Sequence, residues 1–234
     1  MSEMPETPPS DRLLRIGVVP VITIPRADLA VPLVETLAAA GLACAEITLR
    51  TAAGVAAIRQ VRQALPDVLV GAGTVLTAGQ AEEAIAAGAQ FVVTPGFMPG
   101  VTAVCLERNV PIFPGVVTPT EIGMALDAGL TDLKFFPAEA AGGVATLRAL
   151  AGPFPTVRFI PTGGIGPGNL ASYLGEPTVL AVGGSWMVRP EFLESGDWAA
   201  VRAAAEGAVS IFRQVRGSPA GPGPMRSAPM GARP

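Results

Sequence analysis

Short apolar runs rich in β-branched residues alternate with longer, Ala-rich segments of helical pattern along most of the chain. The apolar runs predict eight strands, at residues 16–22, 43–49, 68–71, 90–93, 111–113, 133–136, 157–160 and 179–182. Helical patterns follow the strands, most clearly at residues 27–40, 53–65, 78–87 and 120–128. Strands that alternate with helices in this way indicate a parallel sheet with right-handed crossovers.

Eight such units in 234 residues favour a single (β/α)8 TIM barrel, an α/β fold that reaches this length as one domain. A doubly wound sheet is the alternative, although neither the Gly-rich Rossmann fingerprint nor a Walker loop occurs. The two ends of the chain lack the alternating pattern. We expect residues 1–12 to form an N-terminal tail, residues 13–215 the barrel, and the Pro/Gly-rich residues 216–234 a disordered C-terminal tail.

Composition limits the classes of partner that the chain can have. Half of the residues are hydrophobic, the net charge is −3 and no basic run occurs, which argues against nucleic acid as a partner. No apolar stretch of about 18 residues is free of charges and breakers, so no membrane-spanning segment is expected. The acidic, Pro-containing start does not resemble a signal peptide, which favours a cytoplasmic protein. Cys44 and Cys105 lie in apolar segments and are expected to be reduced core residues.

Lys134 is the single lysine of the chain, beside fifteen arginines and no histidine. Arginine stays charged in any protein environment, whereas a lysine can lose its proton and act as a nucleophile. A bias toward arginine with one surviving structural lysine is the alternative. Because histidine is missing and no carboxylates cluster at ligand spacing, no metal site is expected. Any acid–base step must then use a carboxylate, a hydroxyl or an amine.

Polar residues gather where the predicted strands end, which is where barrels carry their chemistry. Strand alternation places Glu46 on one face with Cys44 and Thr48, and Lys134 on one face with Asp132 and Phe136. If both faces point into the barrel, Glu46 and Lys134 both project inward. A carboxylate buried there is costly unless it has a partner or a function, and a purely structural ion pair is the alternative. Arg50 lies four residues beyond Glu46 and could hold a substrate carboxylate through its planar guanidinium, or be an ordinary surface arginine.

Two Gly-rich segments follow the seventh and eighth predicted strands, at residues 162–165 and 183–185. Glycines allow backbone N–H groups to approach an anion, and barrels often bind phosphate in these two loops. Turns also need glycine for purely structural reasons. The pair of loops nevertheless predicts a phosphate site.

Together these segments closely resemble the bacterial 2-keto-3-deoxy-6-phosphogluconate aldolases, a class I aldolase family that often also acts on 4-hydroxy-2-oxoglutarate. The resemblance runs from about Val18 to Ala208. Its most specific part is the Lys-Phe-Phe-Pro-Ala-Glu sequence that begins at Lys134. It also rests on residues 19–22, 46–51, 71–76, 151–154, 161–165 and 183–186. One departure is Thr94, where many relatives carry Ser; the backbone turn there is expected to stay intact.

The resemblance implies a homotrimer of barrels that cleaves a 2-keto acid through a Schiff base, without metal or cofactor. It implies that Lys134 forms the imine and that Glu46 is the general acid/base. It further implies substrate-binding roles for Arg50, Thr74, Pro95, Phe136 and Thr162, and phosphate binding by Gly163, Gly164, Gly184 and Ser185. Arg50 and Thr74 are expected at the substrate carboxylate.

Other functions stay open at the level of sequence. The substrate could be the galactonate epimer, which differs only in stereochemistry. A phosphate-binding barrel isomerase or synthase could use the same loops with Glu46 as its base. A non-catalytic barrel that binds a sugar phosphate is the third alternative.

Overall fold

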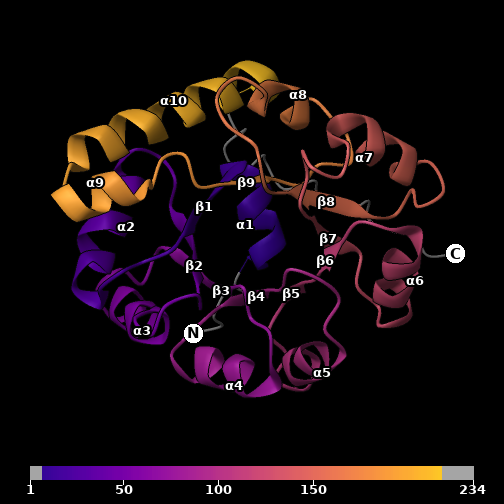
Figure 1. The fold of residues 1–234 in the computed structure, drawn as a ribbon, viewed down its shortest axis with the longest axis horizontal. Helices are drawn as coiled ribbons and strands as arrows, with labels where there is room; N and C mark the ends of the chain where they lie inside the picture. The colour runs from indigo at the N-terminus through magenta and orange to yellow at the C-terminus, as the bar shows by residue number, and fades with distance from the viewer. Residues whose placement is uncertain (1–6, 218–234) are drawn as a thin grey trace, which may run out of the picture.

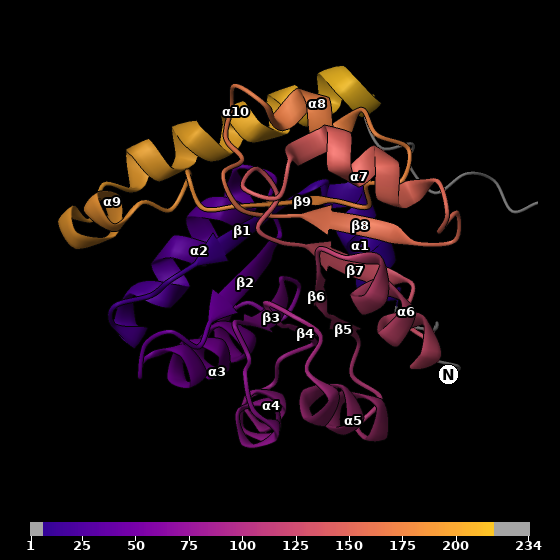
Figure 2. The same cartoon turned by 45° about the vertical axis from the view of Figure 1, so that its right-hand side comes forward.

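The computed structural model describes residues 7–217, and its strands form a ring with helices on the outside (Figures 1 and 2). The strands are β1 (Val18–Ile22), β2 (Cys44–Thr48), β3 (Leu69–Gly73), β4 (Phe91–Val93), β5 (Ile112–Phe113), β6 (Gly115–Val116), β7 (Asp132–Phe135), β8 (Arg158–Pro161) and β9 (Val182–Gly184). The helices are α1 (Pro9–Ile16), η1 (Ala27–Leu29), α2 (Ala30–Ala39), α3 (Gly54–Ala64), α4 (Ala78–Ala86), α5 (Pro99–Glu107), α6 (Pro119–Asp127), α7 (Gly143–Ala151), α8 (Leu170–Leu174), α9 (Pro190–Ser195) and α10 (Trp198–Arg216).

All strand pairs are parallel, in two arcs of order β5-β4-β3-β2-β1-β9 and β6-β7-β8. Between β5 and β6 lies Pro114, which has no N–H to give to the ladder, so β5 ends at Phe113, as predicted, and β6 follows as a short strand that the sequence did not predict. Isolated bridges from Phe159 to Val179 and from Thr162 to Gly183 join β8 to the β9 segment. The arcs thereby close into the predicted (β/α)8 barrel.

The last strand begins later than the sequence predicts. The apolar run at residues 179–182 is buried throughout, but regular pairing with β1 starts only at Val182. Val179 forms only the isolated bridge to Phe159. The predicted strand is therefore longer than β9 because its first residues are buried without regular strand pairing.

Apolar side chains form two layers. The larger one lies between the strands and the surrounding helices and contains Cys105. The smaller one fills the interior of the ring and contains Cys44. Both cysteines are free thiols, as predicted, and burial raises their pKa to about 12 for Cys44 and about 11 for Cys105. Neither thiol is therefore a reactive thiolate near neutral pH.

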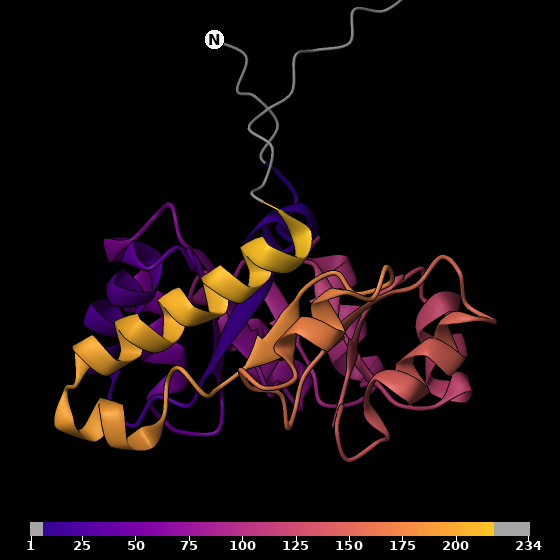
Figure 3. The ribbon, with the colours of Figure 1, turned by 90° about the horizontal axis from the view of Figure 1, so that it is seen from above.

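Helix α1 corrects the predicted N-terminal tail, because residues 9–12 of that tail belong to this helix. Proline at the first helical positions fits the helix start, and Leu13 is almost fully buried in the inner layer, where it packs with side chains of the strands. The helix lies at the amino end of β1, across one end of the ring (Figures 1 and 3). Burial of Leu13 therefore adds tertiary packing to a helix of eight residues, a length that is marginal in isolation.

The predicted C-terminal boundary is one residue early, and residues 218–234 lie outside the described residues. Arg216 ends α10, the long helix that runs across the outside of the barrel (Figure 3). Its guanidinium donates hydrogen bonds of 2.6–3.0 Å to the carbonyls of Leu174, Val179 and Leu180. These bonds attach the end of α10 to the segment between α8 and β9. Among the described residues, no helix combines the length and apolar character needed to cross a bilayer.

Replacing Leu13 by Ala tests whether α1 closes the barrel. The side chain is 1% exposed, so Leu13→Ala should lower the free energy of unfolding by about 2–5 kcal/mol. The neighbouring Leu14 is 40% exposed, and Leu14→Ala should change it by no more than about 0.5 kcal/mol. Urea unfolding of the two variants measures the difference, and equal effects would show that α1 does not contribute to the core.

Candidate active site

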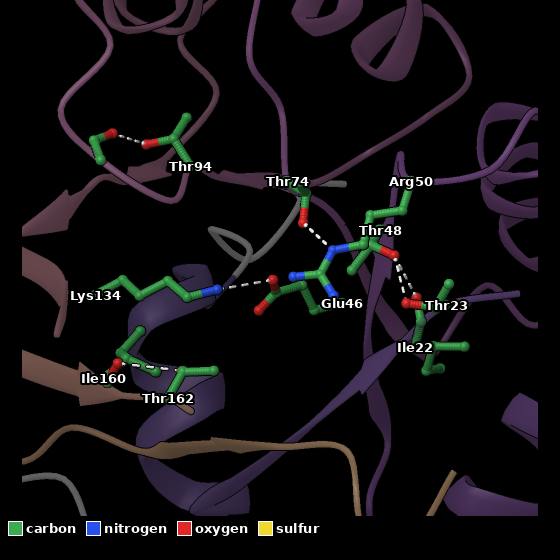
Figure 4. A network of polar contacts seen from close by, with 11 residues as sticks. Ile22, Thr23, Glu46, Thr48, Arg50, Thr74, Thr94, Lys134, Ile160 and Thr162 are labelled. Atoms are coloured by element: carbon green, nitrogen blue, oxygen red, sulfur yellow. Dashed lines mark hydrogen bonds and ion pairs between the residues drawn. The ribbon is translucent and has the colours of Figure 1, made fainter. Parts of the chain in front are cut away.

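Lys134 and Glu46 meet inside the ring, as strand alternation predicts. Nζ of Lys134, on β7, lies 3.2 Å from Oε1 of Glu46, on β2, across the barrel interior (Figure 4). The side chains are 7% and 3% exposed, respectively. A titratable amine and a carboxylate are thus held in contact and largely out of water.

Glycine makes room for this pair. A Cβ atom added to Gly73, at the end of β3, would lie 2.4 Å from Oε1 of Glu46. Gly73 pairs with Thr48 in the β2–β3 register, two residues beyond Glu46. Any side chain at position 73 would therefore push the carboxylate away from its present place.

An aromatic ring borders the amine. Nζ of Lys134 lies 5.2 Å from the centre of the Phe136 ring, at the end of the same strand segment. This ring gives the amine an apolar wall on one side, while Glu46 gives it a proton acceptor on the other.

Arg50 and Thr74 lie together on the rim of the barrel. Nε of Arg50 donates a 3.3 Å hydrogen bond to Oγ1 of Thr74 (Figure 4). Thr74 directly follows β3 and has a φ of 54°, a left-handed conformation that is uncommon for a β-branched residue. Such conformations are concentrated at functional sites. Both predicted carboxylate-binding residues are therefore placed side by side, on the strand ends next to Glu46.

Pro95 lies one strand away from Lys134. A Cβ atom on Gly115 would lie 2.2 Å from the carbonyl oxygen of Pro95, and Gly115 pairs with Lys134 in the β6–β7 register. The preceding residue, Thr94, is buried and donates from its hydroxyl to the carbonyl of Gly96 at 2.7 Å. The turn is therefore formed with Thr at this position.

A cavity of about 490 Å³ opens beside the pair. Its lining includes seven of the predicted site residues, namely Arg50, Phe136, Thr162, Gly163, Gly164, Gly184 and Ser185. Lys134, Glu46, Thr74 and Pro95 are not among the lining residues. Phe136 and Thr162 connect the cavity with the Lys134–Glu46 pair. The ring of Phe136 borders the amine of Lys134. The hydroxyl of Thr162 donates a hydrogen bond to the carbonyl of Ile160, the residue that pairs with Lys134 in the β7–β8 register (Figure 4).

The two Gly-rich loops lie at one wall of this cavity. Gly163 and Gly164 have φ values of 102° and 77°, which favour glycine. Among residues 7–217, the N–H groups of Gly164 and Ser185 donate no hydrogen bond to another protein group. Free backbone donors that line a cavity suit an anionic ligand.

Sequence reasoning missed several residues of the lining. Of these, Arg189 is charged; it lies just before α9 and shares the cavity wall with Ser185. A cation four residues beyond Ser185 was a usable signal. Trp186 also lines the cavity, and its indole N–H is buried without a partner among the described residues. Both charged residues of the lining, Arg50 and Arg189, are arginines, so the cavity suits a ligand with more than one anionic group.

Metal ligands are not assembled in residues 7–217. No group of three or more His, Cys, Asp or Glu side chains in that range is placed to hold a metal ion.

Comparisons with known proteins show which family the chain belongs to. Residues 10–204 match the family model described as "Aldolase: KDPG and KHG aldolase". The chain is 51% identical over 201 residues to the 2-dehydro-3-deoxy-phosphogluconate aldolase of Treponema pallidum, covering 86% of this chain and 96% of that protein. It is 46% identical over 201 residues to the KHG/KDPG aldolase of Escherichia coli, covering 86% of this chain and 94% of that protein.

A solved structure extends the likeness to three dimensions. The KDPG aldolase of Legionella pneumophila, with pyruvate captured as a covalent carbinolamine intermediate, superimposes with a TM-score of 0.83 at 39% identity. The alignment covers 86% of this chain and 98% of the Legionella chain. From the family match and these identities, the chain belongs to the KDPG and KHG aldolase family.

Proposed function

We propose that the protein is a class I aldolase that cleaves 2-dehydro-3-deoxy-6-phosphogluconate to pyruvate and glyceraldehyde 3-phosphate. The 3.2 Å contact between the Lys134 amine and the Glu46 carboxylate, inside the barrel and beside the cavity, is the observation that carries this proposal. The names of the Treponema and Escherichia relatives support the substrate. The carbinolamine in the Legionella relative supports the chemistry.

Lys134 acts as the nucleophile. Its uncharged amine attacks the C2 carbonyl of the substrate and forms a carbinolamine, which loses water to give a protonated imine. To attack, the amine must first give up its proton, and Oε1 of Glu46 lies within hydrogen-bonding distance to receive it. Glu46 then gives this proton to the hydroxyl of the carbinolamine, which leaves as water, so its carboxylate is ionised again before the C3–C4 bond breaks. The imine cation then attracts the electron pair of the C3–C4 bond.

Glu46 moves the remaining protons. Directly or through a water molecule, it accepts the proton of the C4 hydroxyl as the C3–C4 bond breaks and the aldehyde leaves. The electron pair of that bond becomes part of an enamine on Lys134. Protonation of C3 by Glu46 gives the imine of pyruvate, and hydrolysis of this imine releases pyruvate and restores the amine.

The remaining site residues hold the two anionic ends of the substrate. Arg50 and Thr74 bind the carboxylate, since they are hydrogen-bonded on the rim of the barrel next to β2. The phosphate binds to the N–H groups of the two Gly-rich loops, formed by Gly163, Gly164, Gly184 and Ser185. The apolar and hydroxyl groups of Pro95, Phe136 and Thr162 border the reacting carbons. Binding both ends fixes C2 against the amine, which is where binding energy contributes to rate.

A second substrate, 4-hydroxy-2-oxoglutarate, is favoured by the KHG activity named for the Escherichia relative. It carries no phosphate, so its cleavage would use Lys134, Glu46 and Arg50 but not the Gly-rich loops. We further propose, from the family resemblance, that the protein is a homotrimer located in the cytoplasm. Sedimentation equilibrium of the purified protein tests the trimer, and a single monomer mass would contradict it.

Borohydride trapping tests the nucleophile. Because Lys134 is the single lysine, it and the terminal amine are the available primary amines. Incubation with pyruvate and borohydride should attach one reduced pyruvyl group at Lys134, which peptide mass spectrometry locates. Lys134→Arg keeps the positive charge and should abolish both the adduct and turnover while the protein stays folded by circular dichroism.

An unmodified Lys134, or normal turnover by Lys134→Arg, would contradict the imine. The isomerase, the synthase and the non-catalytic barrel would all give no adduct, so the same measurement separates these alternatives from the aldolase.

Gly73→Ala tests the placement of Glu46. The new methyl group must displace the carboxylate, so kcat for pyruvate release should fall about tenfold or more. Gly123→Ala is the matched control, since a Cβ there meets no atom within 4 Å, and it should leave kcat unchanged. Pyruvate release in a coupled assay measures both variants. Unchanged turnover in Gly73→Ala would show that the position of Glu46 is not critical.

A further inference from the structure

The loop that follows Lys134 is attached to the first Gly-rich loop by its backbone. The N–H of Ala138 donates to the carbonyl of Thr162 at 2.8 Å, and the N–H of Glu139 donates to the carbonyl of Gly163 at 3.1 Å. These bonds use carbonyl groups of the loop and leave the N–H of Gly164 free at the cavity. The backbone of the β7–α7 connection thus supports one wall of the cavity from behind.

A side-chain contact extends this support to α8. The carboxylate of Glu139 accepts a hydrogen bond from the phenol of Tyr173, which lies on α8 and is fully buried. Burial, the hydrogen bond to Glu139 and the negative charge of Glu139 all raise the pKa of Tyr173, so the phenol keeps its proton and remains the donor. Hydrogen bonds to an ionised acceptor are stronger than neutral ones.

The Gly-rich loop lies directly against this pair. A Cβ atom on Gly164 would be 2.6 Å from Cβ of Glu139, so no side chain fits between them. A Cβ atom on Gly143, at the start of α7, would lie 3.2 Å from Oε1 of Glu139 and 3.3 Å from Oη of Tyr173. Loop, α7 and α8 therefore meet at the Glu139–Tyr173 contact.

We propose that Glu139 and Tyr173 are positioning residues that hold the Gly163–Gly164 segment in the conformation that binds the substrate phosphate. Neither residue lines the cavity, so both act through the loop. The inference rests on the proposed function, because it assigns a role at the phosphate end of the same site. It predicts that disrupting the contact weakens phosphate binding and leaves imine formation unchanged, since strand pairing and Glu46 hold Lys134 independently.

The Gly163–Gly164 segment is also held by Asn169, which limits the effect expected from loss of the Glu139–Tyr173 contact. Asn169 accepts from the N–H of Gly166 at 2.8 Å and donates to the carbonyl of Gly164 at 3.2 Å. Loss of the Glu139–Tyr173 contact should therefore loosen the segment and not unfold it.

Three variants test the proposal in the full-length protein. Tyr173→Phe removes the donor, Glu139→Ala removes the acceptor, and Glu139→Gln retains an oxygen that can accept the bond. The first two should raise KM for 2-dehydro-3-deoxy-6-phosphogluconate, and the inhibition constant of inorganic phosphate, by about fivefold. Glu139→Gln should stay within about twofold of the wild type. The rate of pyruvate trapping by borohydride should be unchanged in all three, because pyruvate has no phosphate.

A control variant separates this role from general stability. Arg148 of α7 forms a bidentate ion pair with Glu176, two residues beyond the end of α8. Arg148→Gln breaks this other polar contact between α7 and the α8 segment, and it should change neither phosphate inhibition nor pyruvate trapping.

The possible outcomes are distinct. Wild-type phosphate inhibition in Tyr173→Phe, equal losses of phosphate binding and pyruvate trapping, or the same defect in Arg148→Gln would each overturn the positioning role. Failure of the wild-type protein to trap pyruvate would instead overturn the proposed function.

Discussion

The site depends on one buried contact, the 3.2 Å approach of the Lys134 amine to the Glu46 carboxylate inside the barrel. Transfer of either charge alone from water to this interior would be costly, and together the two groups offset part of that cost. Removing one partner of such a pair typically costs about 3–5 kcal/mol, whereas replacing both by apolar residues is often neutral. Stability alone therefore does not account for the pair. An amine that must exchange its proton with a neighbour during the reaction does account for it.

The rest of the barrel places this contact relative to the ligand. Parallel strands bring their carboxyl ends to one rim of the barrel. There the cavity is lined by two arginines, Arg50 just after β2 and Arg189 between β9 and α9. The proposed substrate has a carboxylate at one end and a phosphate at the other, and these two negative charges match the two arginines of the lining. Glycines at positions 73 and 164 permit two close approaches, one to Glu46 of the buried pair and the other to Glu139 behind the first Gly-rich loop.

The sequence predicted those features of the structure that depend on neighbouring residues alone. Alternation along a strand has a period of two, so the inward direction of Glu46 and Lys134 followed from their own segments. Loop glycines likewise located the Gly163–Gly164 segment at a strand end. Helix α1 has local signals, a proline at its start and Gly17 at its end, but at eight residues it depends on the burial of Leu13 against distant strands, which its own segment does not reveal.

Contacts between segments that are distant in the sequence could not be predicted from it. Glu139 and Tyr173 are 34 positions apart, and nothing in either segment indicates that one should contact the other. Arg189, four residues beyond Ser185, was a usable signal, but its position on the cavity wall depends on the turn between β9 and α9. The sequence therefore predicted the Lys134–Glu46 contact better than the contacts that shape the cavity wall.

A crystal structure of the protein soaked with pyruvate, without reductant, tests the central claim most directly. The account predicts continuous electron density from Nζ of Lys134 to C2 of pyruvate, with the Glu46 carboxylate within hydrogen-bonding distance of the bound ligand. Pyruvate bound without a covalent link to Lys134, or an amine that still contacts Glu46 with no ligand attached at saturating pyruvate, would contradict it.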